Sequence, residues 1–472
     1  MVIEVPTQAV YDAFDDVASV MFSKQSIERT KKTSSLLAPG DSRALMFQQR
    51  YFMILQQLFR DSKFIDVARG KRGADFPTIS FFKSTEPKGI PSQSIFAIHS
   101  DQEQSWRFDI TPVESLPGST GTKVVLGMIA RAENGRLCIE DIHQAVAIKM
   151  DNVSATNDFI TLNMFVLTKG EMIDEVFVVS EITLPPIPTR SLCESSINIF
   201  GGPTELTDEV VISTIGTAPE DASIAVLSNV LLDQPDTLEK LQELFTGFEE
   251  CGAVPAAFVF LGNLSSKSFS PFSADHVRGI QKCFDAFAQL LARHPATLER
   301  SKIIIVPGHG EPGHGLYPQP PLGDALVRGL GSRFPNVVLA SNPCRLRFFE
   351  RQLIFFADQN LARLRKCRLV AGGERSADNE ANMLVRCMMS QMHLLPGTGR
   401  DHAVAWEYDA AMRLYPPPHA LFIADSDCAA FQEYSNAESL VVGLPQFAKP
   451  NGFNGEFHLY SPSTNDSTLS SL

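Results

Sequence analysis

The 472-residue chain lacks long apolar runs, paired cysteine motifs and any excess of positive charge. A membrane helix needs roughly 18 consecutive apolar residues, and no stretch of this sequence approaches that. The N-terminus, MVIEVPTQAVYDAFDD, lacks the basic start of a secretory signal. Lys and Arg total 41 against 54 Asp and Glu, a formal net charge of −13. A protein whose main task is to wrap DNA usually needs a basic face, so this composition disfavours that class.

The cysteines are scattered, and none forms a C-x-x-C pair. A secreted disulfide framework or a structural zinc site would need closer spacing. Apolar neighbours, as around Cys251 and Cys283, predict small buried hydrophobic side chains in a reducing compartment. The eight positions are Cys138, Cys193, Cys251, Cys283, Cys344, Cys367, Cys387 and Cys428.

The composition is that of a folded globular protein, with 44% hydrophobic and 20% charged residues. The length suits roughly three structural units. Residues 1–41 predict one short amphipathic helix followed by a polar segment. The basic residues of this segment are either part of a solvated linker or a nuclear import signal. The helical spacing is that of Val10, Phe14, Val17 and Met21, and the basic residues are Lys24, Arg29, Lys31 and Lys32.

Residues 42–190 predict a helix followed by a small β-barrel. Residues 42–64 contain no Gly or Pro, with apolar positions at Leu45, Phe52, Ile54 and Leu58. Asn134-Gly135, between two β runs, favours a type I′ hairpin, which needs positive φ at both central positions. Five short strands suit a barrel of the OB type, and one sheet of a sandwich is the alternative. The predicted strands are 123–130, 136–140, 145–150, 164–169 and 176–182.

Residues 195–472 alternate strand and helix patterns, which predicts a layered α/β domain. The Ser/Thr-rich tail 461–472 is expected to be frayed. Helices are predicted at 237–245 and 273–294. Strands are predicted at 223–231, 256–261, 302–306, 337–340, 353–356, 420–424, 440–443 and 456–460.

The first three strand ends of this domain determine its predicted chemistry, because ligand groups in layered α/β folds come from loops at the carboxyl ends of strands. The segments there are 227–233 (LSNVLLD), 260–266 (FLGNLSS) and 306–315 (VPGHGEPGHG). In this order they resemble the calcineurin-like metallophosphoesterases, which have D-x-H, G-D-x-x-[DN] and G-N-H-[DE] at these places. Two adjacent metals need a bridging carboxylate and further oxygen or nitrogen ligands.

The sequence departs from that pattern at nearly every ligand. Asn229 stands for the first Asp, Leu231 for its His, and Asn263 for the bridging Asp. His309-Gly310 replaces Asn-His, which leaves Glu311, and residues 423–427 contain no G-H-x-H. Leucine cannot bind a metal, and a neutral amide cannot bridge two dications. The resemblance therefore implies a phosphoesterase fold with no catalytic residue, metal ligand or cofactor.

An active phosphoesterase or nuclease is the alternative. His309, Glu311 and His314 lie close together among glycines and could surround a zinc ion, with His393 as a residual site histidine. The opposing interpretation is a polar surface loop with glycines in tight turns and a packed His393. No G-x-S-x-G, P-loop or dinucleotide-binding motif is present.

An OB barrel followed by such a domain resembles the B subunits of eukaryotic replicative DNA polymerases, and most of all those of DNA polymerase epsilon. B subunits of polymerase alpha or delta are the alternative. The resemblance covers residues 42–472 and is carried by 46–51 (MFQQRY), 125–129, 137–141, 200–203 (FGGP), 230–241 (VLLDQPDTLEKL), 258–265 (FVFLGNLS), 306–308, 312–313, 341–345 (SNPCR), 390–393 (SQMH), 411–416 (AMRLYP) and 421–425 (LFIAD).

This resemblance implies a non-catalytic accessory subunit in the nucleus. It would bind and stabilise the C-terminal zinc module of the catalytic subunit in chromosomal replication, with DNA contacted through the complex. The family usually starts with a longer helical domain that contacts the replicative helicase machinery. Only about 40 residues precede the matching helix here, so that contact is expected to be altered or missing. Phe165 and Phe177 are the candidates for stacking on single strands in the barrel, with core packing as the alternative.

Overall fold

The computed structural model describes residues 38–60, 110–194 and 216–472, with gaps at 152, 154–157, 235, 271, 314, 371–376, 398–402, 429, 436–437 and 450–451. The helix predicted around residues 10–21 and its linker lie outside the described residues, as does the segment 61–109. No helix in the described ranges combines the length and apolar character that a membrane span requires.

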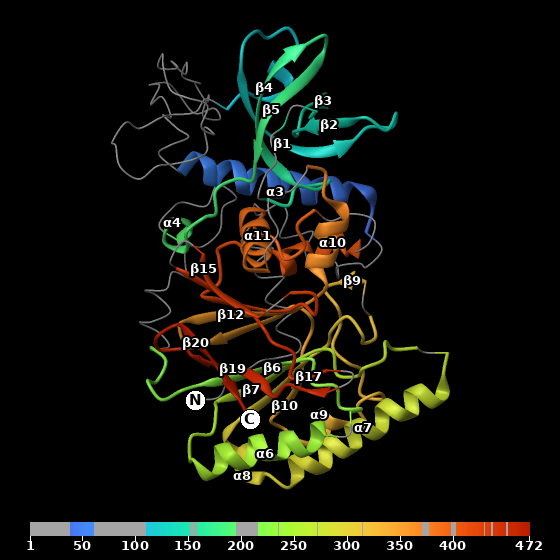
Figure 1. The fold of residues 1–472 in the computed structure, drawn as a ribbon, viewed down its shortest axis with the longest axis vertical. Coiled ribbons are helices and arrows are strands. Elements are labelled where there is room, and N and C mark those ends of the chain that lie inside the picture. The colour runs from blue at the N-terminus through green and yellow to red at the C-terminus, as the bar shows by residue number, and fades with distance from the viewer. Residues whose placement is uncertain are drawn as a thin grey trace, which may run out of the picture.

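Helix α3 (Gly40–Arg60) lies beneath a five-stranded barrel (Figure 1). Strand pairing runs in the order β1-β2-β3-β5-β4, and β4 pairs again with β1. All five predicted strands are confirmed, and the largest difference is that β4 continues four residues beyond Lys169. The strands are β1 (Lys123–Arg131), β2 (Leu137–Glu140), β3 (Ala145–Lys149), β4 (Phe165–Ile173) and β5 (Val176–Thr183), flanked by the short helices η1 (Val113–Ser115) and α4 (Arg190–Glu194).

The β1–β2 hairpin forms as predicted, but the turn type is wrong. The Gly135 amide donates to the Ala132 carbonyl at 2.9 Å, which makes Glu133 and Asn134 the central residues. Neither of them has a positive φ, whereas Gly135 has φ 82°. The connection is therefore longer than a two-residue type I′ loop, and the glycine is needed at the residue after the turn.

The first α/β sheet has the order β10-β8-β7-β6-β19-β20. Strands β10, β8, β7 and β6 are parallel, and β19 joins β6 antiparallel. Helices α6, α7 and α8 cover one face (Figure 1). The strands are β6 (Ile224–Ser228), β7 (Ala257–Leu261), β8 (Lys302–Val306), β10 (Val337–Leu339), β19 (Glu456–Ser461) and β20 (Asp466–Ser471), and the helices are α6 (Thr237–Glu250), α7 (Ala274–Ala292), α8 (Pro295–Arg300) and α9 (Leu330–Arg333).

The second sheet has the order β11-β12-β14-β16-β15 and packs its apolar face against the first sheet. Helices α10 and α11 lie on the side of this sheet that faces the barrel (Figure 1). The elements are β11 (Cys344–Phe348), β12 (Arg351–Ala357), β14 (Ala420–Ala424), β15 (Phe431–Ser435), β16 (Ser439–Gly443), α10 (Asn360–Cys367), α11 (Ala377–Ser390) and η2 (Trp406–Met412), with the short pairs β9 (Leu316–Tyr317) and β13 (Ala403–Val404), and β17 (Ala448–Lys449) and β18 (Gly452–Phe453).

Several predicted boundaries are wrong for identifiable reasons. The tail 461–472 is not frayed, because its strand β20 pairs with β19. The pairing begins with Ser461 opposite Asp466 and ends with Glu456 opposite Ser471. Strand β6 ends at Ser228 because Asn229 and Leu231 have left-handed φ values of 50° and 42°. Helix α6 continues past Gly247 to Glu250, since one glycine costs a helix only about 1 kcal/mol.

Burial corrects two further predictions. Leu45 is 46% exposed, and the neighbouring Met46 is buried in its place. Cys251 and Cys367 are exposed, so the prediction of buried cysteines fails at both. It is confirmed for Cys138, Cys193, Cys344 and Cys387, which are buried.

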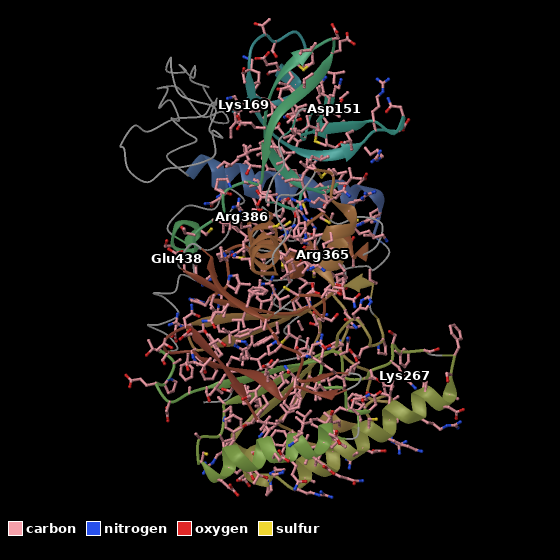
Figure 2. The ribbon with its side chains drawn as sticks, viewed as in Figure 1. Asp151, Lys169, Lys267, Arg365, Arg386 and Glu438 are labelled. Atoms are coloured by element: carbon pink, nitrogen blue, oxygen red, sulfur yellow. The ribbon has the colours of Figure 1, made fainter. Side chains whose placement is uncertain are left out.

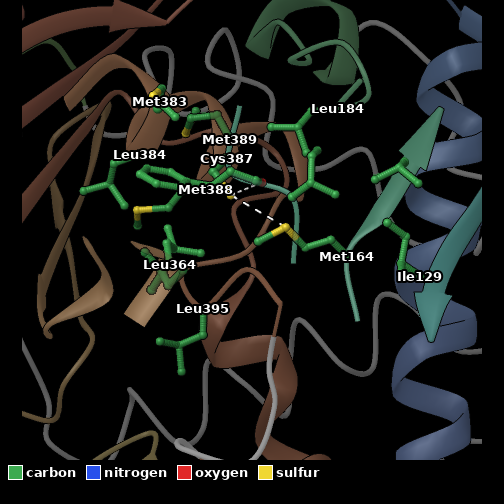
Figure 3. Close-up of a cluster of buried hydrophobic side chains, with 14 of the residues drawn as sticks. Ile129, Met164, Leu184, Leu364, Met383, Leu384, Cys387, Met388, Met389 and Leu395 are labelled. Atoms are coloured by element: carbon green, nitrogen blue, oxygen red, sulfur yellow. Dashed lines mark hydrogen bonds between the residues drawn. The ribbon is translucent and has the colours of Figure 1, made fainter. Parts of the chain in front are cut away.

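One apolar cluster continues from the barrel into the α/β part of the chain (Figure 3). Ile129 and Met164 of the barrel side pack in the same cluster as Met388 of α11, and the Sγ of Cys387 lies 3.9 Å from the Sδ of Met164. Polar contacts join the same two parts. The Gln391 amide accepts from the backbone N of Phe165 and donates to its O, both at 2.8 Å. At the edge of this contact Arg386 on α11 (Figure 2) pairs with Asp158, with 3.1 Å between Nε and Oδ1.

Candidate functional site

The loops after β6, β7 and β8 begin side by side at one edge of the first sheet. Ser228 is in register with Leu261, and Leu261 with Val306. Because the strands are parallel, their carboxyl ends meet, as in other layered α/β folds. The structure therefore brings together three of the residues that the sequence singled out, Asn229, Asn263 and Glu311.

The side-chain oxygens at this edge bind backbone N–H groups. The Oδ1 of Asn229 accepts from the backbone N of Asn263 at 3.1 Å, and the Oδ1 of Asn263 accepts from that of Gly310 at 2.7 Å. The two carboxylate oxygens of Glu311, which is 6% exposed, accept from Leu264 N and Gly308 N, each at 2.7 Å. These side-chain oxygens thus join three loops to one another.

The backbones of two loops approach so closely that no side chain fits between them. A Cβ added to Gly262 would lie 2.2 Å from the N of Gly308 and 2.8 Å from the Oε2 of Glu311. A Cβ on Gly308 would lie 2.8 Å from the carbonyl carbon of Gly262. These glycines are required by close approach and not by a turn.

Leu231, at the position where the sequence resemblance expects the histidine of a D-x-H motif, has an apolar, buried side chain. It is 4% exposed and has φ 42°, a conformation that costs a non-glycine residue on the order of 1–3 kcal/mol. Its backbone N donates to the Asn263 carbonyl at 3.4 Å, and that of Leu232 to the Leu264 carbonyl at 2.8 Å. The loop is held against the β7 loop by main-chain contacts, with no polar side chain at this position.

A segment that the sequence interpretation missed completes this edge. Residues 423–427, the expected counterpart of the last phosphoesterase motif, span the end of β14 in the other sheet. The loop after β16 reaches the site: Phe447 N donates to Ser228 O at 2.8 Å, and Ala448 N to Asn229 O at 3.1 Å. Residues 444–448 (LPQFA) contain no His, Cys, Asp or Glu. No sequence signal pointed to them, because they come from a different sheet.

Asp425, at the end of β14, has a separate environment. Its carboxylate accepts from Leu361 N at 2.8 Å and from Asp427 N at 3.0 Å. Burial raises its pKa to about 6. It fixes the start of α10 and lies outside the strand-end site.

The zinc site considered for His309, Glu311 and His314 does not form in the part of the chain that the structure describes. Glu311 is directed to backbone amides, and His314 lies outside the described residues. Within the ranges that the structure describes, no group of three or more His, Cys, Asp and Glu side chains is placed to hold a metal.

His393 is a packed histidine in a buried charged cluster with Arg50, Asp409 and Arg413. Its Nε2 accepts from the Nη2 of Arg50 at 2.7 Å. Arg50 also pairs with the Oδ1 of Asp409, and the Nε of Arg413 donates to the Oδ2 of Asp409 at 2.8 Å. The four side chains are at most 5% exposed. The cluster joins α3 to η2 and to the loop after α11.

The electrostatics of this cluster indicate a structural role. Burial and the Arg50 guanidinium lower the pKa of His393 to about 4, so its ring is neutral. Because a guanidinium can only donate, Nε2 is the acceptor and the proton is on Nδ1, which lies 3.1 Å from the Leu395 carbonyl oxygen. Burial alone would raise the pKa of Asp409, but Arg50 and Arg413 hold it well below its usual range. One carboxylate therefore serves two buried guanidinium groups.

Comparisons with known proteins cover both parts of the chain. The family of the B subunit of DNA polymerase alpha/epsilon matches residues 224–433, and "DNA polymerase epsilon subunit 2-like, OB-fold domain" matches residues 40–186. The chain is 27% identical to the B subunit of DNA polymerase epsilon from Arabidopsis thaliana, over 98% of this chain and 83% of the relative. It is 30% identical to DNA polymerase epsilon subunit 2 of Homo sapiens, over 78% of this chain and 69% of the relative. Among solved structures, an archaeal phosphodiesterase aligns with 53% of this chain and with 99% of its own chain, at 8% sequence identity. The TM-score of 0.27 is too low to carry an argument about the fold.

Proposed function

This chain belongs to the family of DNA polymerase epsilon B subunits and is thus an accessory subunit of that polymerase, and we propose that it contributes no chemistry of its own. In this proposal its second domain has a phosphoesterase-like fold that has lost its reaction. The protein supplies binding surfaces that hold and stabilise the catalytic subunit.

The use of the strand-end oxygens is the observation that carries this proposal. Asn229, Asn263 and Glu311 all accept hydrogen bonds from the backbones of neighbouring loops. A two-metal phosphoesterase needs a bridging carboxylate at this edge and open ligand positions for water and phosphate. Here the amides are neutral and the one carboxylate is already satisfied.

The proposed partner is the C-terminal zinc module of the catalytic subunit, and the proposed location is the nucleus. With a net charge of −13, the chain is better suited to contacts with protein than to direct contacts with phosphates. The stacking candidates Phe165 and Phe177 are 3% and 0% exposed, so both pack in the core and neither can stack on a base. DNA would be reached through the complex, and contacts with other replisome components belong to the same proposal.

Co-expression with tagged polymerase chains tests the partner. We expect a stable complex with the epsilon catalytic subunit, identified by mass spectrometry of the purified complex. Recovery of an alpha or delta chain would assign the protein to a different polymerase. A chain that stays monomeric in the presence of all three would contradict the proposal.

Elemental analysis and an activity assay test the absence of chemistry. We expect no stoichiometric Mn, Fe or Zn in the purified chain and no Mn²⁺-dependent hydrolysis of phosphodiesters. The active alternative predicts turnover that Glu311→Gln abolishes, since this change keeps one hydrogen-bond acceptor but removes the charge. Such turnover would overturn the proposal.

A further inference from the structure

Strand β20 is the last strand at one side of the first sheet (Figure 1). It pairs with β19 in an unbroken antiparallel register from Asp466 to Ser471, and no strand in the described ranges pairs with its other side. We call this other side the β20 edge. An uncovered strand edge presents a row of backbone N–H and C=O groups that can pair with a further strand.

The hydrogen bonds of the β19–β20 hairpin determine which backbone groups point outward. Leu472 N donates to the Gly455 carbonyl at 3.1 Å, so these two residues form a hydrogen-bonded pair. Such pairs alternate along an antiparallel ladder. Every second residue from 466 to 470 therefore bonds to β19, and the backbone groups between them face outward. Leu469 and Ser471 are two of the outward residues, and their N–H groups donate to no residue that the structure describes.

The β20 edge lacks the features by which proteins usually prevent strand addition. Protected edge strands are very short, carry charged residues or proline, or contain a bulge. Elsewhere in the chain β10 has three residues, and β11 carries Arg345 and Arg347. Strand β20 has six residues and no register shift. Its one charged residue, Asp466, accepts from Ser467 N at 2.8 Å, and residues 467–472 contain neither a charge nor a proline.

The β20 edge also exposes apolar side chains. Leu469 is 53% exposed and Leu472 is 47% exposed. Leu469 lies opposite His458, so it is on the same face of the sheet as Tyr460. The Tyr460 ring packs between the two sheets, 5.5 Å from that of Phe422. An apolar residue of an added strand would therefore cover Leu469 and extend the core between the sheets.

We propose that the β20 edge binds an extended, uncharged segment of a different protein chain, which adds a strand to the first sheet. The backbone of the segment pairs with Leu469 and Ser471, and one of its apolar side chains packs beside Leu469. Only another strand supplies alternating donors and acceptors at the spacing of this edge. A second copy of this chain fits less well, since each copy carries a net charge of −13. The site does not depend on the proposed contact with the zinc module.

Hydrogen exchange at single-residue resolution tests the β20 edge directly. In the purified chain, the amides of Leu469 and Ser471 should exchange fast, and those of Thr468 and Ser470 should exchange slowly. In the complex purified from cells, all four amides should be protected. Fast exchange of the two outward amides in the complex would overturn the proposal. Their protection in the purified monomer would assign the edge to another segment of this chain, and protection that appears only on dimerisation would assign it to a second copy; either result would also overturn it.

Ser471 offers a matched pair of variants. Ser471→Pro removes the outward N–H and no hydrogen bond to β19, since proline is tolerated on an edge strand where its nitrogen faces solvent. Ser471→Thr keeps the N–H and suits a strand. Ser471→Pro should lower the amount of partner chain recovered with the full chain at least about threefold relative to Ser471→Thr, because a hydrogen bond of the added strand is lost. Equal recovery with the two variants would overturn the proposal.

A second pair of variants decides the matter if circular dichroism shows that Ser471→Pro does not fold. Leu469→Lys places a charge on the β20 edge, as protected edge strands do, and Leu469→Val is its control. Leu469→Lys should lower recovery of the partner chain and Leu469→Val should retain it. Equal recovery with these two variants would contradict the proposal.

Photocrosslinking identifies the added strand. Benzoylphenylalanine at position 469 of the full chain, in the complex purified from cells, should crosslink to one short uncharged segment of a different chain. Crosslinks confined to this chain would contradict the proposal. Recovery of the epsilon catalytic subunit with no crosslink to any other chain would contradict the β20 edge alone and leave the proposed function intact, so the two failures are distinguishable.

Discussion

The buried cluster of Arg50, Asp409, Arg413 and His393 gives the most direct test of how the two parts of the chain are held together. Asp409→Asn changes the charge of one side chain and almost none of its volume. The carboxylate now accepts from both guanidinium groups. An amide offers one oxygen, and its NH₂ group would face one of the two cations.

The expected loss follows from burial. Breaking a buried ion pair by neutralising one partner costs about 3–5 kcal/mol, because the remaining charge stays buried and uncompensated. Here two buried guanidinium groups lose their shared counterion. Typical stabilities are about 5–15 kcal/mol, so Asp409→Asn should remove a large part of the total.

Urea unfolding and hydrogen exchange measure this effect. We expect a lower midpoint and faster exchange in α3 (Gly40–Arg60), which Arg50 joins to η2. Adding Arg50→Met should restore part of the stability by removing one unpaired cation. The control is Asp275→Asn, whose side chain is 93% exposed in its pair with Arg278, and it should not change the midpoint. A loss below about 1 kcal/mol for Asp409→Asn would refute the reasoning.

Three further predictions concern the site, its neighbouring helix and pH. Gly262→Ala should lower the free energy of unfolding by at least about 2 kcal/mol in chemical denaturation, because its Cβ would lie 2.2 Å from Gly308 N. Gly279→Ala should raise it by about 0.5–1 kcal/mol, because a Cβ there meets nothing within 4 Å. Equal effects of the two changes would contradict the close approach of the two loops at Gly262. Ser273→Ala should cost about 1 kcal/mol in thermal unfolding, since Ser273 Oγ accepts from His276 N at 3.3 Å, whereas Ser273→Asp should retain the cap. The pKa of His393 is lowered to about 4 in the folded chain, against about 6.5 in an unfolded chain. The unfolded chain therefore binds a proton first as the pH falls, so the stabilisation of the fold by the neutral ring is complete above pH 6.5 and is lost between pH 6.5 and pH 4. The stability difference between the unaltered chain and His393→Gln should shrink by roughly 3 kcal/mol over that window, and a difference independent of pH would show that the ring is not held neutral.

Local sequence patterns predicted the buried strands well. The bounds of 302–306 and 420–424 match β8 and β14 residue for residue, because continuous apolar runs between polar residues define strands buried on both faces. The prediction for the tail 461–472 was wrong for the opposite reason. Its Ser and Thr residues carry no apolar pattern, and β20 exists because β19 supplies its hydrogen-bonding partner.

The long-range polar contacts could not be predicted from spacing. Arg50 and Asp409 are 359 positions apart, and neither residue reveals its partner in a single sequence. A weaker signal did exist, since Arg50, His393 and Arg413 all lie in segments that carry the family resemblance. The structure gives a physical reason for that grouping: these segments meet in the cluster that joins α3 to the α/β domain.

The strand-end site was partly predictable, because parallel strands bring their carboxyl ends together. The sequence therefore placed Asn229, Asn263 and Glu311 near one another correctly, and it interpreted the two amides as lost metal ligands. The structure adds what the amides do instead. A cluster of carboxylates at this edge would repel one another without cations, whereas neutral amide oxygens accept from Asn263 N and Gly310 N with no counterion. The hydrogen bonds of Asn229, Asn263 and Glu311 thus connect the loops after β6, β7 and β8, and two of these three acceptors carry no charge.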